Sequence, residues 1–236
     1  MKKMSRREVI GTSGATLAGL SLGVLKPEEL LAQTQQQPSP DGLVETALRN
    51  VAPLPLNLDG SAPEHAPEEA GPISGIIWRY TDGQPPEIEY DYRRMSIKVD
   101  PRRGANLSGT LTFADLEPLP RRSAVHLLQC GAPEPSGIVK WTGVRFSDFA
   151  AMLGVQPFTA YCRIIGSDRY WIEEDMNTMM HPQVMLAWLM NDEPIPPEHG
   201  APLRLIIPFR YGARSIKAIT EIYMTATSFP SSQFPG

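Results

Sequence analysis

The sequence has few cysteines, little net positive charge and no strongly apolar long run, and each shortage excludes a class of protein. Two cysteines among 236 residues, Cys130 and Cys162, cannot form the several-bridge framework of small secreted domains, although a single bridge between them stays open. The formal net charge is −4, whereas a nucleic-acid-binding domain needs a basic face. The sequence contains no phosphate-binding loop, no dinucleotide fingerprint and no serine-hydrolase elbow. We therefore expect neither nucleic-acid binding nor those nucleotide and hydrolase chemistries.

The first 32 residues have the layout of a twin-arginine export signal. Ser5 precedes the pair Arg6–Arg7, and a weakly apolar run from Val9 to Leu25 follows. Several Gly, Ser and Thr residues make this run too weakly hydrophobic for a membrane span. We predict export to the periplasm with cleavage near Ala32; the alternative is an N-terminal amphipathic helix of the fold. The twin-arginine route commonly carries proteins folded around a cofactor, which favours a cofactor enzyme.

Proline density divides the remainder of the chain. Residues 33–86 hold nine of the 24 prolines, which block helices and central strands, so we predict extended arms and turns there, with one strand at 73–80. The compact domain is predicted at 87–230. Many short strands and few short helices indicate an α+β class. Strands are expected at 94–99, 161–165, 170–172, 203–207 and 215–226, a buried apolar segment at 184–190, and short helices after Thr112, Ser147 and Asp175.

Cys130 stands at the end of a strand-like apolar run, and a loop of Gly, Pro and Ser follows it. A thiol at such a position can hold a soft metal or react with an electrophile. The alternative is a buried free cysteine that only fills space.

A second informative stretch, residues 199–217, is rich in cationic groups within an otherwise acidic chain. It contains His199, Arg204, Arg210, Arg214 and Lys217, with glycines among them. Arginine side chains and backbone amides freed by glycine suit a phosphate or another anion. The alternative is a charged, solvated hairpin.

These two stretches together resemble the molybdopterin-binding domain of the sulfite-oxidase family. The resemblance extends from Thr112 to Thr225, with LTFADLEPLPRRSAVHLLQC before the cysteine, WTGV starting eleven residues after it, and HPQVMLAWLMNDEPIPPEHGAPLRLIIPFRYGARSIKAITEI at the C-terminal end. It covers about half of the chain and implies a fold of mixed short sheets with a few short helices.

The resemblance implies a molybdenum–molybdopterin cofactor and a role for particular residues. Cys130 would supply the one protein thiolate to molybdenum, and such a coordinated thiol is deprotonated. The residues implied to hold the pterin and its phosphate are His199, Arg204, Ser215, Ile216 and Lys217. A further contact is expected at Ser167 or Asp168.

The departures from the family pattern bear on the substrate. Sulfite oxidases follow the cysteine with an Asn-Arg-Arg segment that helps hold an anion, whereas this chain has Gly131-Ala-Pro-Glu-Pro. Their haem domain, their dimerisation domain and a tyrosine beyond the final motif have no expected counterpart here. Size and export signal are most similar to the family's periplasmic methionine-sulfoxide reductase branch, although ISGIIWRYTDG replaces that branch's Asn-Asn-Phe-Tyr-Glu segment.

We therefore expect a monomeric periplasmic oxidoreductase that transfers an oxygen atom, with sulfoxide reduction favoured over sulfite oxidation. Its substrate would be a small-molecule or protein-bound oxo compound. A separate partner, such as a membrane haem protein, would supply the electrons. The alternative is a periplasmic binding or assembly protein that keeps the fold without turnover.

Overall fold

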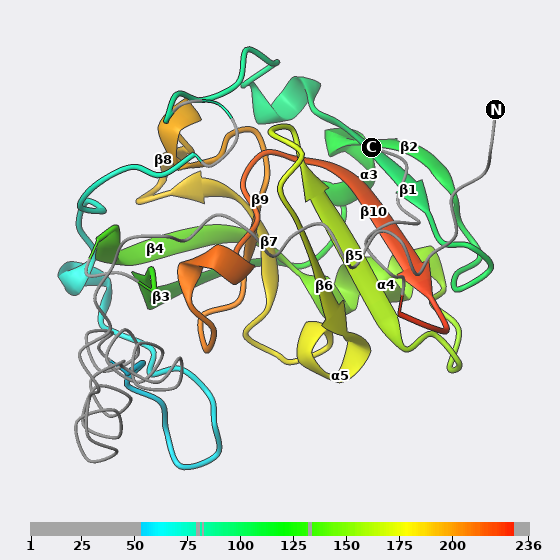
Figure 1. Cartoon of the computed structure of the whole chain (residues 1–236), viewed down its shortest axis with the longest axis horizontal. Coiled ribbons are helices and arrows are strands. Elements are labelled where there is room, and N and C mark those ends of the chain that lie inside the picture. Colours follow the sequence, from blue (N-terminus) through cyan, green and yellow to red (C-terminus); the bar gives the residue numbers. More distant parts are fainter. Residues whose placement is uncertain (1–52, 79–80, 82, 132–133, 229–236) are drawn as a thin grey trace, which may run out of the picture. The chain divides into compact units, whose positions relative to one another are not determined.

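A computed structural model of the chain describes residues 53–78, 81, 83–131 and 134–228 (Figure 1). These residues belong to one unit, which begins at Asn50. The segment predicted as an export signal lies outside the described residues. The described part contains one mixed sheet, one antiparallel sheet and a few short helices, so the predicted α+β class is confirmed.

Sheet I has the strand order β2-β1-β10-β5-β6, and sheet II has the order β3-β4-β7-β8 with β9 paired to β7. The strands of sheet I are β1 (Ser96–Asp100), β2 (Gly109–Thr112), β5 (Tyr161–Gly166), β6 (Trp171–Asp175) and β10 (Ile219–Thr225). Those of sheet II are β3 (Arg121–Gln129), β4 (Ser136–Arg145), β7 (Met185–Met190), β8 (Glu193–Pro194) and β9 (Arg204–Ile206). The helices are η1 (Pro67–Glu69), η2 (Tyr92–Arg94), α3 (Phe113–Leu116), α4 (Phe146–Leu153), α5 (Met176–Met179), η3 (Pro197–His199) and η4 (Gly212–Arg214).

Strand β7 explains the apolar run at 184–190, because it is buried along its whole length. Leu186 and Trp188 belong to the larger core cluster, which also includes side chains of sheet I such as Ile97. Met185 and Ala187 face a second, smaller cluster. Side chains alternate between the faces of a strand, so a strand between two cores needs apolar residues at every position.

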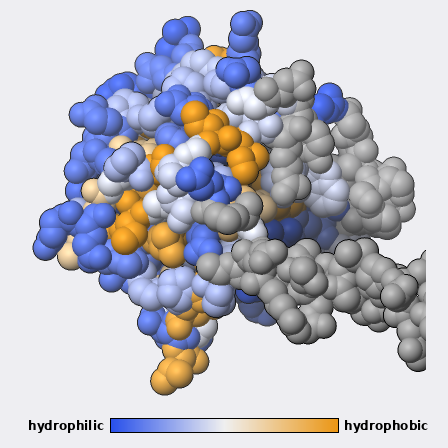
Figure 2. All heavy atoms as spheres, turned by 60° about the vertical axis from the view of Figure 1, so that its left-hand side comes forward, coloured by the Kyte–Doolittle hydropathy of each residue, from blue (hydrophilic) through white to orange (hydrophobic). Residues whose placement is uncertain are grey.

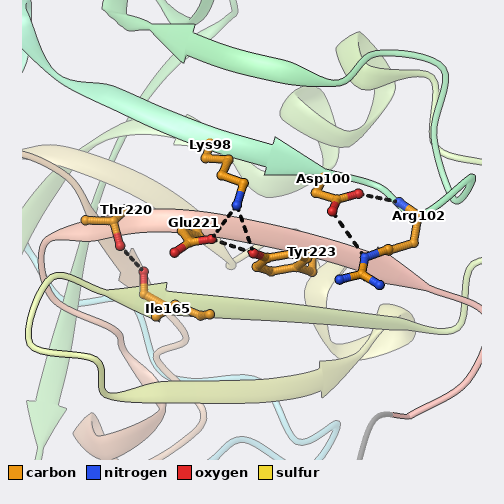
Figure 3. Close-up of polar contacts among 7 residues, drawn as sticks. All are labelled: Lys98, Asp100, Arg102, Ile165, Thr220, Glu221 and Tyr223. Atoms are coloured by element: carbon orange, nitrogen blue, oxygen red, sulfur yellow. Dashed lines mark hydrogen bonds and ion pairs between the residues drawn. The ribbon is translucent and has the colours of Figure 1, made fainter. Parts of the chain in front are cut away.

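The one parallel strand pair of sheet I, β1 with β10, carries a polar network on its surface (Figure 3). The Lys98 ammonium donates hydrogen bonds to Glu221 at 3.2 Å and to the Tyr223 hydroxyl at 3.3 Å. The Arg102 guanidinium donates to Asp100 from the end of β1. These side chains stabilise the strand pairing and lie on a different sheet from Cys130.

The hairpin of β3 and β4 places Cys130. Nine consecutive residue pairs join the two strands, ending at Gln129 and Ser136, so their connecting loop begins with the cysteine. The Cys130 amide donates to the Pro135 carbonyl at 2.9 Å and closes this loop. The hairpin thus presents the thiol at the end of a rigid ladder.

Two local predictions are wrong, each because a tertiary contact outweighs the local sequence. Helix α4 begins at Phe146 with Arg145 as its N-cap, so Ser147 lies inside the helix; the Phe146 amide donates to Val184, which fixes the start. The described part of 73–80 forms no strand and makes only the isolated bridge between Ser74 and Ser136. Gly75, with a φ of 71°, interrupts the extended chain there.

The short helices predicted after Thr112 and Asp175 are present as α3 and α5. Asp115 accepts a hydrogen bond from the amide of Thr112, the N-cap of α3, and Asp175 caps α5. Gly154 ends α4 with a φ of 66°. The two cysteines are both free, so the single bridge left open by the sequence is absent.

Candidate functional site

Cys130 lines a partly open cavity of about 90 Å³ beside the β3–β4 hairpin. Its other lining residues come from five separate parts of the chain: Ile77, Trp78, Leu128, Pro135, Asp168, Tyr170, Arg204, Gly212, Ala213, Ser215 and Lys217. Figure 2 views the molecule from the side of β3 and β4 and shows hydrophobic patches between hydrophilic side chains. The cavity wall is likewise mainly apolar, with a few polar groups, as in typical small-molecule sites.

Strand β9 carries Arg204 into this cavity. The side chain is only 3% exposed, and its Nη1 donates to the His199 carbonyl at 2.7 Å. Its guanidinium lies 5.1 Å from the ring centroid of Trp141. No carboxylate pairs with Arg204 in the described part of the chain, and burial lowers its pKa to about 9. A buried cation without a counter-ion is costly and is well placed to receive an anion.

Lys217 adds a second cation to the cavity. Its Nζ donates to the carbonyls of Ile77 at 2.9 Å and Glu198 at 2.8 Å, and lies 4.7 Å from the ring centroid of Trp78. Burial, with a smaller contribution from the Arg204 guanidinium, lowers its pKa to about 7. The two cations therefore give one end of the cavity a positive potential.

Two polar residues beside the cations complete this end. The Ser215 hydroxyl is buried and accepts a hydrogen bond from the Ile207 amide at 3.1 Å. The Asp168 carboxylate, in the turn between β5 and β6, accepts from the Tyr170 amide at 3.0 Å. Of the two candidates in this turn, Asp168 lines the cavity, whereas Ser167 does not.

Within the part of the chain that the structure describes, three buried polar atoms at or next to the cavity have no hydrogen-bond partner. They are Nε of Arg204, Nε1 of Trp78 and Oγ of Ser167. An unpaired buried donor costs on the order of 1–3 kcal/mol, so native proteins usually provide a partner. A bound group rich in oxygen and nitrogen acceptors would satisfy such atoms, which fits a pterin with a phosphate.

The cationic block predicted from the sequence divides in the structure. Arg214 pairs with Glu174 at 2.6 Å and does not line the cavity, and Arg210 is exposed with its guanidinium near the Phe209 ring. The four Lys and Arg side chains of this stretch therefore do not all line one cavity. Of the Lys and Arg side chains in this block, only Arg204 and Lys217 line the cavity of Cys130.

Two further residues predicted to hold the pterin do not line this cavity. Ile216 is 2% exposed and packs in the larger core. His199 is half-buried at a separate hollow that also includes Glu198, although its carbonyl holds Arg204. Burial and the nearby Arg204 lower the pKa of His199, which favours a neutral imidazole. Direct cofactor contacts by these two residues stay predictions.

The sequence reasoning missed Trp78 and Tyr170 as cavity residues. Both are aromatic residues within predicted strands, where packing was the simpler interpretation. Tyr170 donates from its hydroxyl to the Ala213 carbonyl at 3.0 Å, which ties β6 to the loop before Ser215. Only the folded chain brings these segments to the same wall as Cys130.

Two absences apply to the described residues alone. No group of three or more His, Cys, Asp or Glu side chains there could hold a metal ion. Within the same residues, none of the helices has both the length and the hydrophobicity to cross a membrane.

Comparison with known proteins gives a family match and several relatives. A family model described as "Oxidoreductase molybdopterin binding domain" matches residues 83–233. The chain is 27% identical to human mitochondrial sulfite oxidase over 237 aligned positions, covering 87% of this chain and 43% of the relative. It is 28% identical over 155 residues to the protein-methionine-sulfoxide reductase catalytic subunit MsrP of Campylobacter jejuni, covering 58% and 52%.

Two more matches bear on partners and on the fold. A putative protein-methionine-sulfoxide reductase subunit, YedZ1 of Azospira oryzae, is 32% identical over 95 residues, covering 40% of this chain and 36% of the relative. Among solved structures, the sulfane dehydrogenase SoxCD of Paracoccus pantotrophus superposes with a TM-score of 0.55 at 19% identity, covering 91% of this chain and 57% of that chain. The likeness to SoxCD supports the fold. The chain spans about half or less of the three sequence relatives.

Proposed function

The chain belongs to the family of oxidoreductase molybdopterin-binding domains, and on this premise we propose that it is an exported oxygen-atom-transfer enzyme that reduces sulfoxides in preference to oxidising sulfite. The family implies molybdenum bound to molybdopterin as the cofactor. The observation that carries the proposal is the position of the Cys130 thiol in the same cavity as the buried cations Arg204 and Lys217.

The residues of the cavity fit this cofactor. A thiolate suits a thiophilic metal, so Cys130 would be the protein ligand. Arg204, Lys217 and Ser215 would hold the pterin and its phosphate. The Asp168 carboxylate, whose charge is opposite to that of the two cations, would accept hydrogen bonds from the pterin. Molybdenum, when bound, supplies the exchange of an oxygen atom and two electrons with the substrate.

The protein's own contribution is an electrostatic one. Arg204 and Lys217 lie in a poorly solvated place, where their attraction for an anion is stronger than in water. A bound phosphate would also restore the ordinary protonation of Lys217, because an opposite charge nearby raises the pKa of a cation. The same two groups would orient the pterin so that its sulfur atoms and the Cys130 thiolate meet at one point.

The preference for sulfoxide over sulfite rests on the charge at the cavity mouth. Sulfite is an anion at neutral pH, whereas a sulfoxide is neutral. Two cationic side chains, Arg204 and Lys217, line the described cavity. Both are assigned to the cofactor and not to an anionic substrate. The loop after Cys130 contributes the exposed carboxylate of Glu134, which repels anions, while Ile77 and Pro135 offer apolar contact to a thioether.

We also propose a separate electron-transfer partner, a monomeric state and a periplasmic location. The partner is supported by the relative named as a reductase subunit. The location is supported by the Arg6–Arg7 pair and the weakly apolar run after it. Replacing both arginines by lysine should leave the chain in the cytoplasm in a cell fractionation.

The test is metal analysis followed by a substrate panel. Protein from a molybdenum-replete host should contain pterin and about one molybdenum per chain, because one cysteine, Cys130, lines the cavity. With a reduced viologen donor it should turn over methionine sulfoxide at least about tenfold faster, in kcat/KM, than it oxidises sulfite with a dye acceptor. Absence of molybdenum would sink the enzyme proposal and favour a binding or assembly role. Faster sulfite oxidation would overturn the substrate preference alone.

A further inference from the structure

Residues 71–78, which we call the strap, form one wall of the Cys130 cavity. The Gly71 amide donates to Ile138 at 2.8 Å, and the Ser74 amide donates to Ser136 at 2.9 Å, so the strap is attached to the first residues of β4. Gly137 allows this close approach, because a Cβ there would lie 2.7 Å from the Pro72 carbonyl oxygen. The strap is thus tied to the hairpin that presents the cysteine.

The far end of the strap is held by a cavity residue. The Lys217 ammonium donates to the Ile77 carbonyl at 2.9 Å and lies over the Trp78 ring, 4.7 Å from its centroid. Lys217 follows the buried Ser215 and Ile216 before β10, so the attachment joins parts of the chain about 140 residues apart. Trp78 is only 5% exposed, yet its indole lines the cavity.

The indole nitrogen of Trp78 has no hydrogen-bond partner although it is shielded from solvent. Tryptophan N–H groups usually find an acceptor when they are buried. A phenylalanine at this position would have no unpaired N–H donor, so apolar packing alone does not account for the indole nitrogen. The nearby Lys217 and Arg204 give the surroundings a positive potential, which favours an acceptor on an anionic ligand.

We propose that Trp78 is a cofactor-binding residue, whose indole N–H donates to an acceptor atom of the phosphate-bearing pterin while its ring covers the cavity wall. The strap then takes the place of the Asn-Asn-Phe-Tyr-Glu segment of the methionine-sulfoxide reductase branch, which has no match in this sequence. This inference rests on the molybdopterin cofactor of the proposed function. The inference gives the strap a role in binding the cofactor, which its irregular backbone alone would not suggest.

The test compares Trp78→Phe with wild type in the full chain, with and without cofactor. Trp78→Phe keeps an aromatic ring and removes the donor. Pterin fluorescence and molybdenum content should show that the loaded variant loses its cofactor about tenfold faster than wild type during dialysis, the effect of one hydrogen bond to a charged or polar acceptor. The cofactor-free variant, made in a host that lacks the cofactor, should unfold at the wild-type temperature or above it.

Ile76→Ala is the matched control, because Ile76 belongs to the same strap, is 51% exposed and does not line the cavity. It should keep the wild-type rate of cofactor loss. Equal cofactor loss in Trp78→Phe and wild type would overturn the inference, as would an equal fall in unfolding temperature with and without cofactor, which marks a packing residue. A wild-type chain that never contains pterin would overturn the proposed function as well.

Discussion

The two cysteines lie in opposite surroundings, although both follow or belong to β-strands. Cys162 lies within β5, is fully buried in the larger core, and burial raises the pKa of its thiol. Cys130 lies one residue beyond β3, is partly exposed, and lines a cavity that contains the Lys217 ammonium. A protein ligand needs access to the metal, and of the two cysteines only Cys130 lines a cavity. Position in the fold, and not residue type, separates the proposed ligand from the packing residue.

Two arginines of the cationic stretch 199–217 differ from each other in the same way. Arg204 is buried without a carboxylate partner, whereas Arg214 is neutralised by Glu174. A cation that already has a counter-ion gains little from a phosphate, while an unpaired buried one gains much. The structure therefore distinguishes a buried cation that has no carboxylate partner among the described residues from a neutralised one, within a stretch that looks uniform in sequence.

The largest expected effect separates the cysteines. Cys130→Ser should lower sulfoxide turnover by more than about 100-fold, because loss of a metal ligand exceeds the 10–100-fold cost typical of groups that only support one. Cys162→Ser places a hydroxyl in the core and should lower the free energy of unfolding by about 1–3 kcal/mol while leaving turnover per folded molecule unchanged. Viologen-coupled assays and chemical denaturation measure the two quantities. Similar losses of turnover in both variants would break the comparison.

An intermediate effect is expected for the arginines. Arg204→Met should lower the cofactor content of purified protein about tenfold, since removal of a charged hydrogen-bond donor costs roughly 1.5–3 kcal/mol. Arg210→Met is the matched control, because Arg210 is exposed and belongs to the same block. Pterin fluorescence per chain gives the readout. Equal cofactor content in the two variants would mean that the unpaired charge of Arg204 has no binding role.

The smallest effect concerns the pH dependence of the cofactor-free chain. Burial lowers the pKa of Lys217 from 10.5 to about 7. Between about pH 7 and pH 10 the unfolded chain keeps this proton and the folded chain releases it, so the free energy of unfolding should rise with pH in this window. We expect a gain of about 1 kcal/mol from pH 7 to pH 9, reduced by partial solvent exposure.

Lys217→Met removes this group and supplies the control. The variant should be more stable than wild type at pH 7 without cofactor, and the difference should shrink toward pH 9. Denaturant titrations at the two pH values measure it. A constant difference between variant and wild type would show that Lys217 does not titrate in this range.

The sequence predicts the strand-to-cysteine unit and the buried run of β7 because both depend on local patterns. Apolar residues at every position of 184–190 require burial on two faces, whatever the neighbours are. Cys130 at the end of an apolar strand was expected for the same local reason. The expected fold of mixed short sheets with a few short helices followed from the resemblance and not from periodicity.

Long-range contacts account for what the sequence did not predict. The start of α4 depends on a bond from Phe146 to Val184, and the strap depends on Lys217, which lies far along the chain. Arg214 looks like an anion-binding residue until Glu174 is placed beside it. Each of these errors concerns a partner that is distant in sequence, which local propensity cannot specify.

The central claim, that Cys130 and not Cys162 binds the metal, is tested most directly by X-ray absorption at the molybdenum edge. Wild type should show the sulfurs of the pterin and one additional sulfur ligand. We predict that Cys162→Ser keeps this number of sulfur ligands and that Cys130→Ser, in whatever cofactor it retains, shows one fewer. An unchanged sulfur shell in Cys130→Ser would contradict the account.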